Sequence, residues 1–178
     1  MDWDTTMART HSHESLRDLL VDQLKDLYWA ETASVQLWPR IAAAATDTKL
    51  REALDAHVGK THRHVERLKS VFTELGLPPE GETSQAMHGL MLEAQDAITD
   101  YQDPSVRDAA LITAVQRMEH YEMASYGTVR TFAEVLGYGN IADTLQKTLD
   151  EEGEADHKLT DIAVGSFFTK GINQQAAE

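Results

Sequence analysis

The sequence predicts an all-α protein, an antiparallel four-helix bundle built from two helical hairpins with a fifth, shorter helix. Glycine and proline are clustered, and long stretches of helix-favouring residues run between the clusters. Apolar residues in these stretches recur every three or four positions, as on the buried face of an amphipathic helix. The 178 residues suffice for one such domain, which we place at 15–165, between a disordered N-terminus, 1–14, and a C-terminal tail, 166–178.

The first hairpin is defined by its turn and by the signals at its two ends. Its first helix begins near Ser12 or Ser15 and continues past Pro39, which we expect to bend the helix rather than end it. A short turn at Thr46-Asp47 leads into the second helix. Gly76 ends this second helix, because glycine followed by proline is typical of a helix C-terminus.

The second hairpin follows a shorter helix predicted over residues 84–100. Asp103-Pro104 then has the pattern of an N-cap residue followed by proline at the first helical position, so a long helix begins there and continues to about residue 136. Gly137-Tyr138-Gly139 interrupts the helical pattern, and the last helix covers about 140–165.

Composition excludes several classes of function. The chain has 30 acidic and 16 basic residues, and its net charge of −14 opposes binding to nucleic acid or to anionic membranes. Without cysteine it has no thiolate metal site, so any metal must be held by His, Asp and Glu. We find neither a secretory leader nor the ~20 apolar residues of a membrane helix. We therefore expect a cytoplasmic protein that contacts neither nucleic acid nor membrane.

Four of the five helices carry polar residues in the middle of their apolar stripes. Glu31 alone interrupts the stripe of the first helix, whereas the second has three successive polar positions, at His57, Thr61 and His64. The two helices of the second hairpin each contribute two carboxylates. The interrupting residues of metal-ligating type are Glu31, His57, His64, Glu119, Glu122, Glu152 and Asp156.

These interruptions lie at similar heights along the bundle. Glu31 precedes Ala45 by 14 residues and Thr61 follows Asp47 by 14 residues, so both lie about 20 Å from the first turn. The acidic residues of the second hairpin meet in the same way, and packing the hairpins together makes one polar cluster. Five carboxylates cannot all remain ionised in a dry core without compensation. A pair of divalent metal ions would provide it.

Each of these residues taken alone has a plainer interpretation. Glu31 is compatible with a surface position slightly out of phase with the stripe, and either His57 or His64 with a hydrogen-bonded core histidine. Tyr28 and Tyr126, one turn from the carboxylates, suit core packing, hydrogen bonding to metal-bound carboxylates or electron relay. The coincidence of four helices at one height is what favours the metal site.

Several stretches of the sequence are more specific than the helical pattern. On these stretches the chain resembles the ferritin-like superfamily, and closely the YciE/YciF-type bacterial stress proteins, over about residues 15–163. The resemblance implies a five-helix ferritin-like fold, a homodimer and a stress-associated role. The stretches are Lys25–Glu31, His64–Leu68, Asp108–Ile112 and especially Glu119–Gly127.

The acidic spacing also resembles the rubrerythrin di-iron site. Glu119-x-x-Glu122 followed by Glu152 is similar to the second half of that site. Glu31 matches the single carboxylate of the first helix, and His64 matches the histidine of the Glu-x-x-His motif in the second. The resemblance therefore implies a dinuclear centre.

The chain departs from that pattern at three places. Thr61 stands where Glu-x-x-His would supply a bridging carboxylate, and Glu152-Gly153-Glu154-Ala155 replaces a second Glu-x-x-His. His57, one turn before Thr61, is a possible replacement ligand. Lys60 stands where similar proteins commonly carry glutamate, and it either faces solvent or neutralises a carboxylate at the edge of the site.

Two functions follow from these observations. The first is a redox centre, with two Fe ions or with Mn or a mixed pair, that reacts with peroxide or dioxygen or oxidises Fe(II) and needs an external electron donor. Here Glu119 or Glu122 bridges, Glu31 and Glu152 are terminal ligands, the two histidines supply nitrogens, and Tyr28, Tyr126 and Thr61 support the ligands. The alternative is a non-enzymatic helical dimer, with a degenerate or mononuclear site, that acts as a stress-induced binding protein.

Overall fold

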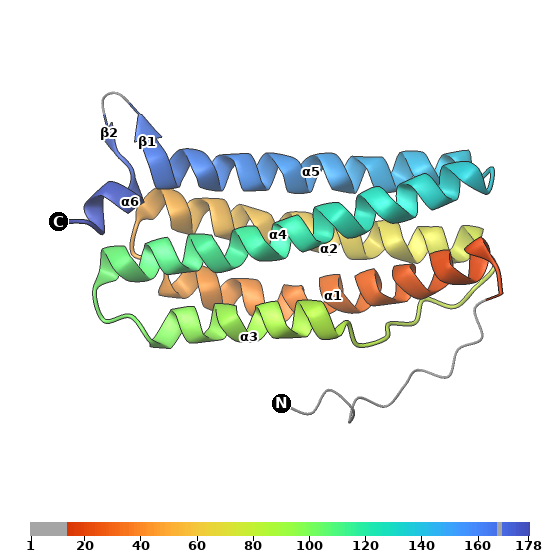
Figure 1. Cartoon of the computed structure of the whole chain (residues 1–178), viewed down its shortest axis with the longest axis horizontal. Helices are drawn as coiled ribbons and strands as arrows, with labels where there is room; N and C mark the ends of the chain where they lie inside the picture. Colours follow the sequence, from red (N-terminus) through yellow and green to blue (C-terminus); the bar gives the residue numbers. More distant parts are fainter. Residues whose placement is uncertain (1–13, 167–168) are drawn as a thin grey trace.

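The computed structural model describes residues 14–166 and 169–178, and it confirms the predicted all-α bundle of two hairpins with a fifth, shorter helix (Figure 1). Residues 1–13 of the predicted disordered N-terminus lie outside the described residues. None of the helices in the described ranges is long and apolar enough to cross a membrane. The elements are α1 (Leu16–Ala44), α2 (Thr48–Glu74), α3 (Gln85–Thr99), α4 (Pro104–Val135), α5 (Gly139–Val164), β1 (Gly165–Ser166), β2 (Thr169–Lys170) and α6 (Ile172–Gln175).

The helix ends are set by the local signals in the sequence. The side chains of Ser15 and Asp103 accept hydrogen bonds from backbone N–H groups in the first turns of α1 and α4, as N-cap residues do. α1 continues through Pro39, as predicted. Gly76 adopts a φ of 72°, and the N–H of Leu77 bonds to the carbonyl of Phe72, which closes α2 with a glycine C-cap.

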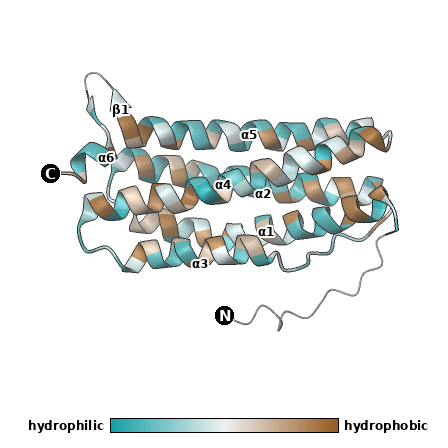
Figure 2. Cartoon of the chain, viewed as in Figure 1, coloured by the Kyte–Doolittle hydropathy of each residue, from teal (hydrophilic) through white to brown (hydrophobic). Residues whose placement is uncertain are grey.

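Four long helices form the bundle, and α3 lies outside it (Figure 1). α1 pairs with α2 and α4 with α5, α2 packs on α5 and α1 on α4, and α3 lies against α1 and α4. Hydrophilic and hydrophobic residues alternate along every long helix in Figure 2. Each helix can therefore bury one face and leave the other in water.

A buried carboxylate fastens the two hairpins together at one end of the bundle. Asp108, near the start of α4, is 2% exposed and accepts hydrogen bonds from the backbone N–H groups of Thr46 and Asp47, at 2.8 and 2.7 Å. The hydroxyl of Thr46 donates a third bond at 2.6 Å. These bonds hold the α1–α2 turn against α4, so the register between the hairpins is constrained.

The predicted tail contains a small ordered structure within its described residues. β1 and β2 pair antiparallel, with Gly165 opposite Lys170, and α6 follows. Gly165 has a φ of 77°, and a Cβ there would lie 2.2 Å from the backbone nitrogen of Gly171. Only glycine fits at this close approach between two backbone segments.

The apolar core is divided into two clusters. One surrounds Trp38, Leu54 and Val115, towards the α1–α2 turn, and the other surrounds Leu24 and Phe72, towards the α4–α5 turn. Between them lies a buried layer of polar side chains. The functional site is in this layer.

Candidate metal centre

The polar layer brings together side chains from all four long helices. Six of the seven predicted ligands and Thr61 are each 6% exposed or less. Their common height follows from the helix lengths on either side of the two turns, as predicted. The buried members of this layer are Glu31, His57, Thr61, His64, Glu119, Glu122 and Glu152.

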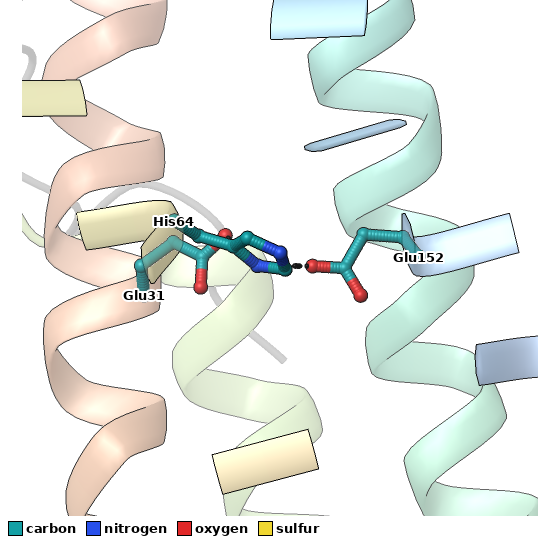
Figure 3. A group of neighbouring side chains, drawn as sticks. All are labelled: Glu31, His64 and Glu152. Carbon is teal, nitrogen blue, oxygen red and sulfur yellow. Dashed lines mark ion pairs between the residues drawn. The ribbon is translucent and has the colours of Figure 1, made fainter. Parts of the chain in front are cut away.

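The first group of potential metal ligands consists of Glu31, His64 and Glu152. His64 Nδ1 lies 2.8 Å from Glu152 Oε1 and 3.3 Å from Glu31 Oε1, but neither approach has the geometry of a hydrogen bond. In Figure 3 the imidazole of His64 lies between the two carboxylates. The three ligand atoms lie within 4.8 Å of one another, so a single ion could contact all three.

The second group consists of His57, Glu119 and Glu152. His57 Nε2 lies 3.3 Å from Glu119 Oε1 and 3.8 Å from Glu152 Oε2, and these atoms also lie within 4.8 Å of one another. The ring of Trp38 packs edge-on against His57, with 4.8 Å between the ring centroids. His57, which the sequence suggested as a replacement for the missing Glu-x-x-His carboxylate, is therefore placed to act as a ligand.

Glu152 is common to both groups. Its Oε1 faces His64 and its Oε2 faces His57. The sequence analysis gave the bridging role to Glu119 or Glu122 and a terminal role to Glu152, whereas this geometry presents Glu152 as the shared carboxylate. α5 packs on α2, and this contact brings Glu152 close to both histidines of α2.

Two predicted ligands lie outside both groups. Glu122 is buried, and its Oε1 has no hydrogen-bond partner; burial and the nearby carboxylates of Glu31 and Glu152 raise its pKa well above 4.5. Glu122 is thus a buried carboxylate near Glu31 and Glu152 that belongs to neither ligand group. The structure does not bring Asp156 to the cluster, because its carboxylate accepts a 3.0 Å hydrogen bond from Gln116 and lies 3.7 Å from the exposed ring of His120.

The three predicted supporting residues have different surroundings. Tyr126 donates a 2.7 Å hydrogen bond to Glu31 Oε1, as expected for a residue that orients a ligand. The Thr61 hydroxyl donates instead to the backbone carbonyl of His57 on its own helix, at 3.2 Å. Tyr28 packs edge-on against Phe72, with 5.9 Å between centroids.

Lys60 lies at the edge of the site, as one of the two alternatives had it, but it pairs with the exposed carboxylate of Glu154 and not with a buried one. Its Nζ donates to the backbone carbonyl of Glu151, at 3.3 Å, and lies 3.5 Å from Glu154 Oε2. The side chain is 25% exposed. It thus joins α2 to α5 at the rim of the site.

Two important residues were missed by the sequence reasoning. Glu151 Oε2 lies 2.9 Å from His64 Nε2, and Arg67 donates a 2.6 Å hydrogen bond to Glu151 Oε1 and a 3.2 Å bond to Thr148. These residues lie beside the apolar stripes and not on them, so a search along the stripes does not find them. The available signal was a pair of opposite charges beside the stripes at the height of the cluster.

Burial and mutual repulsion dominate the electrostatics of the carboxylates. Burial, together with the charge of Glu152, raises the pKa of Glu119 well above 4.5. Burial also raises the pKa of Glu31, against the opposing effect of His64. For Glu152 the effect of burial is outweighed by His64 and the other neighbouring groups, and its pKa falls to about 2.

The two histidines respond to burial in opposite ways. Burial lowers the pKa of His57 to about 4. For His64, burial also acts to lower the pKa, but the adjacent carboxylates of Glu152 and Glu31 outweigh it and raise the pKa to about 10. In the absence of a metal, a protonated His64 therefore compensates part of the buried negative charge.

The residues present fit a metal centre. Buried atoms without a hydrogen-bond partner are rare in folded proteins, yet both oxygens of Glu119, both of Glu152, and Nδ1 of each histidine are in this condition. His64 Nε2 is already engaged by Glu151, which leaves Nδ1 for an ion, as is usual for metal-binding histidines. The oxygen and imidazole donor set suits Fe, Mn or Zn. These buried groups could hold a metal ion.

Known proteins similar to this chain include two solved structures. The E. coli protein YciF is 40% identical over 162 residues, which cover 90% of this chain and 98% of YciF. Its crystal structure, described as that of a stress protein, has a TM-score of 0.82 at 41% identity and covers 85% of this chain and 96% of its own. The YcfI protein of Rhodopseudomonas palustris has a TM-score of 0.84 at 36% identity, with 87% and 99% covered.

A family model also matches nearly the whole described chain. The model is that of a domain of unknown function, DUF892, and it matches residues 15–177. Together with the similarity to YciF, this match confirms the resemblance found in the sequence. The chain belongs to the DUF892 family and is a protein of the YciE/YciF type.

Proposed function

We propose that this protein is a stress-related dinuclear metalloprotein that binds two iron ions, or manganese or a mixed pair, and reacts with peroxide or dioxygen or oxidises Fe(II). One ion would be held by Glu31, His64 and Glu152, and the other by His57, Glu119 and Glu152. Such a pair supplies two electrons to an oxidant when both ions are ferrous. The stress role is inferred from the description of the E. coli relative.

One observation carries the proposal. His64 Nδ1 is buried, has no hydrogen bond and faces two carboxylates, while Nε2 is fixed by Glu151, which in turn accepts a hydrogen bond from Arg67. A histidine that only packs or forms hydrogen bonds would not need two buried carboxylates beside it, nor a second histidine that faces one of the same carboxylates. The arrangement is that of a ligand whose outer nitrogen is oriented by a carboxylate.

The chain's own residues would orient and enclose the reacting ions. Tyr126 holds the Glu31 carboxylate, and Arg67 holds the Glu151 carboxylate on the outer side of His64. Apolar clusters border the ligand layer above and below. We further propose an external electron donor, since the chain contains no cysteine for a built-in iron–sulfur or rubredoxin-type centre. We also propose that the protein is a homodimer.

Metal loading tests the proposal directly. The metal-free protein would be loaded anaerobically with Fe(II), its metal content measured, and one equivalent of hydrogen peroxide added while ferric absorbance is followed. We expect about two ions per chain and rapid oxidation in the wild type. Glu152→Ala should lose both ions, because it removes the shared carboxylate while keeping a good helix former.

A matched variant controls for surface charge and folding. Asp150→Ala removes an exposed carboxylate from the same turn of α5. This carboxylate accepts a hydrogen bond from Gln146 on its own helix, and the variant should bind metal like the wild type. Circular dichroism would verify equal helix content. Retention of both ions by Glu152→Ala, or less than about one tightly held ion per wild-type chain, would contradict the proposal.

A further inference from the structure

A pocket of about 240 Å³ lies beside the second ligand group, between α2, α4 and α5. His57 and Glu119, both buried, lie at its inner end. Its outer rim includes Ala56, Glu154 and Lys158, which are exposed. The pocket therefore leads from solvent to one half of the ligand cluster, whereas the other half, around His64, is 1% exposed or less.

The walls of this pocket are apolar. They are formed mainly by the buried side chains Ala53, Leu54, Val115 and Leu159. A ligand pocket with apolar walls and a few convergent polar groups at one end is the usual design of a small-molecule site. Here the polar end has unpartnered buried atoms, namely His57 Nδ1 and both oxygens of Glu119. These atoms belong to the second ligand group, so a molecule in the pocket would meet the ion held there at its inner end.

The size of the pocket discriminates between oxidants. At 240 Å³ it is larger than the engineered cavity of ~150 Å³ that takes up benzene in another protein. Hydrogen peroxide or dioxygen, with two heavy atoms, would leave most of this space and all of the apolar walls without a partner. A molecule with a hydrocarbon body of about six to ten carbon atoms would fill it.

The charges at the rim also bear on the ligand. Lys60 is engaged by the Glu151 carbonyl and by Glu154, so its charge is partly compensated, and Lys158 is exposed at the mouth. The inner end carries acidic groups. This balance provides no strong selection for an anion or a cation, and it suits an uncharged ligand with one polar end.

We propose that this pocket binds the hydrocarbon body of a small organic hydroperoxide and presents its –OOH group to the His57 half of the ligand cluster. The inference rests on the proposed function and names its substrate class. The peroxide R–O–OH accepts two electrons and two protons, the O–O bond breaks, and ROH and water leave. The electrons come from two ferrous ions, which become ferric, and the protons come from solvent through the open mouth.

Binding to the metal-free protein provides a test that does not depend on turnover. The ligand is 2-phenyl-2-propanol, the unreactive alcohol product of cumene hydroperoxide, and calorimetry measures its affinity. We expect saturable binding with one molecule per chain. Ala155→Phe, which places a ring in the pocket from α5, should weaken binding by about tenfold or more, because the space is then occupied.

Two further variants guard against misfolding and nonspecific effects. Ala56→Phe narrows the mouth from an exposed position of α2 and should also weaken binding, so a folding defect in Ala155→Phe would not decide the outcome. Ala124→Phe, at an exposed position of α4 away from the pocket lining, should bind like the wild type. Equal binding by all four proteins, or no binding by the wild type, would overturn the inference.

Single turnovers of the iron-loaded protein separate this inference from the proposed function. Oxidation by both hydrogen peroxide and cumene hydroperoxide, with a selective loss for the latter in Ala155→Phe, would support both. Oxidation by hydrogen peroxide alone, without alcohol binding, would refute the organic substrate and leave the proposed function standing. Oxidation by neither peroxide would refute the proposed function, and the hydroperoxide assignment with it.

Discussion

The two halves of the ligand cluster differ in how well their histidines are supported. His64 is enclosed and has its outer nitrogen fixed by Glu151, which Arg67 holds, and its neighbour Glu31 is held by Tyr126. His57 has an unpartnered Nδ1, faces a carboxylate whose oxygens are both unpartnered, and borders an open pocket. Fixed ligands bind metals more tightly than mobile ones. If two ions bind as we propose, we therefore expect the ion at His64 to be held tightly and the ion at His57 to be more exchangeable and accessible.

This asymmetry also relates to the departures from the rubrerythrin-like pattern. Thr61, in place of a bridging carboxylate, hydrogen-bonds to its own helix, so Glu152 alone is shared between the halves. A site with fewer shared carboxylates couples its two ions less strongly. The predictions below test whether the halves behave as two separable sites.

The largest effect is expected from removing a ligand that belongs to one half only. Glu119→Ala should reduce the metal content from about two ions per chain to about one, because the His64 half keeps all three of its ligands. Metal analysis after gel filtration would measure this. Glu66→Ala, which removes an exposed carboxylate that pairs with Lys69 on α2, is the control. Loss of both ions in Glu119→Ala would show that the halves are not separable.

A smaller effect is expected from the residue behind His64. Glu151→Gln should weaken the tighter ion by about 10- to 100-fold, because the neutral amide no longer orients and polarises the imidazole and no longer pairs with Arg67. Competition with a coloured chelator would measure the affinity. The neighbouring exposed substitution Asp150→Asn should leave the affinity unchanged. An unchanged affinity in Glu151→Gln would remove the basis for calling the His64 half the tighter one.

The smallest effect is a pH dependence of the metal-free protein. The pKa of His64 is raised to about 10, so its stabilising contribution is complete below pH 6.5 and is lost as pH rises through about 10. Burial raises the pKa of Glu119, an acid, so its ionisation above pH 4.5 also costs stability. Both changes lower stability as pH rises, and the change at His64 occurs between pH 6.5 and about 10. The melting temperature of the metal-free protein should therefore fall over that range.

Bound metal should reduce this fall, because it compensates the carboxylates and replaces the proton on His64. Calorimetric melting temperatures at pH 7 and pH 9, with and without metal, would measure the difference. In Glu119→Gln the metal-free protein should lose less stability than the wild type as pH rises above 4.5, because the amide cannot ionise. A metal-free protein that is equally stable or more stable at pH 9 would contradict this assignment of charge.

The amino-acid sequence by itself determined the fold class, the helix ends and the height of the polar layer. Caps such as Asp103 and Gly76 act through bonds within a few residues, and helical periodicity fixes which side chains share a face. Because residue counts from the turns give distances along a helix, Glu31, His57, His64, Glu119, Glu122 and Glu152 were recognised as one cluster.

The tertiary structure decided how these residues are grouped. The rotation of α5 against α2 makes Glu152 the shared carboxylate, places Glu151 behind His64, and leaves Asp156 with Gln116 outside the cluster. A rotation of one helix by a fraction of a turn would exchange these roles without changing any helical periodicity. The pocket at His57 likewise exists only where side chains of three helices leave space unfilled. Helix rotation and packing volume depend on contacts between distant segments, which a pattern along one chain does not specify.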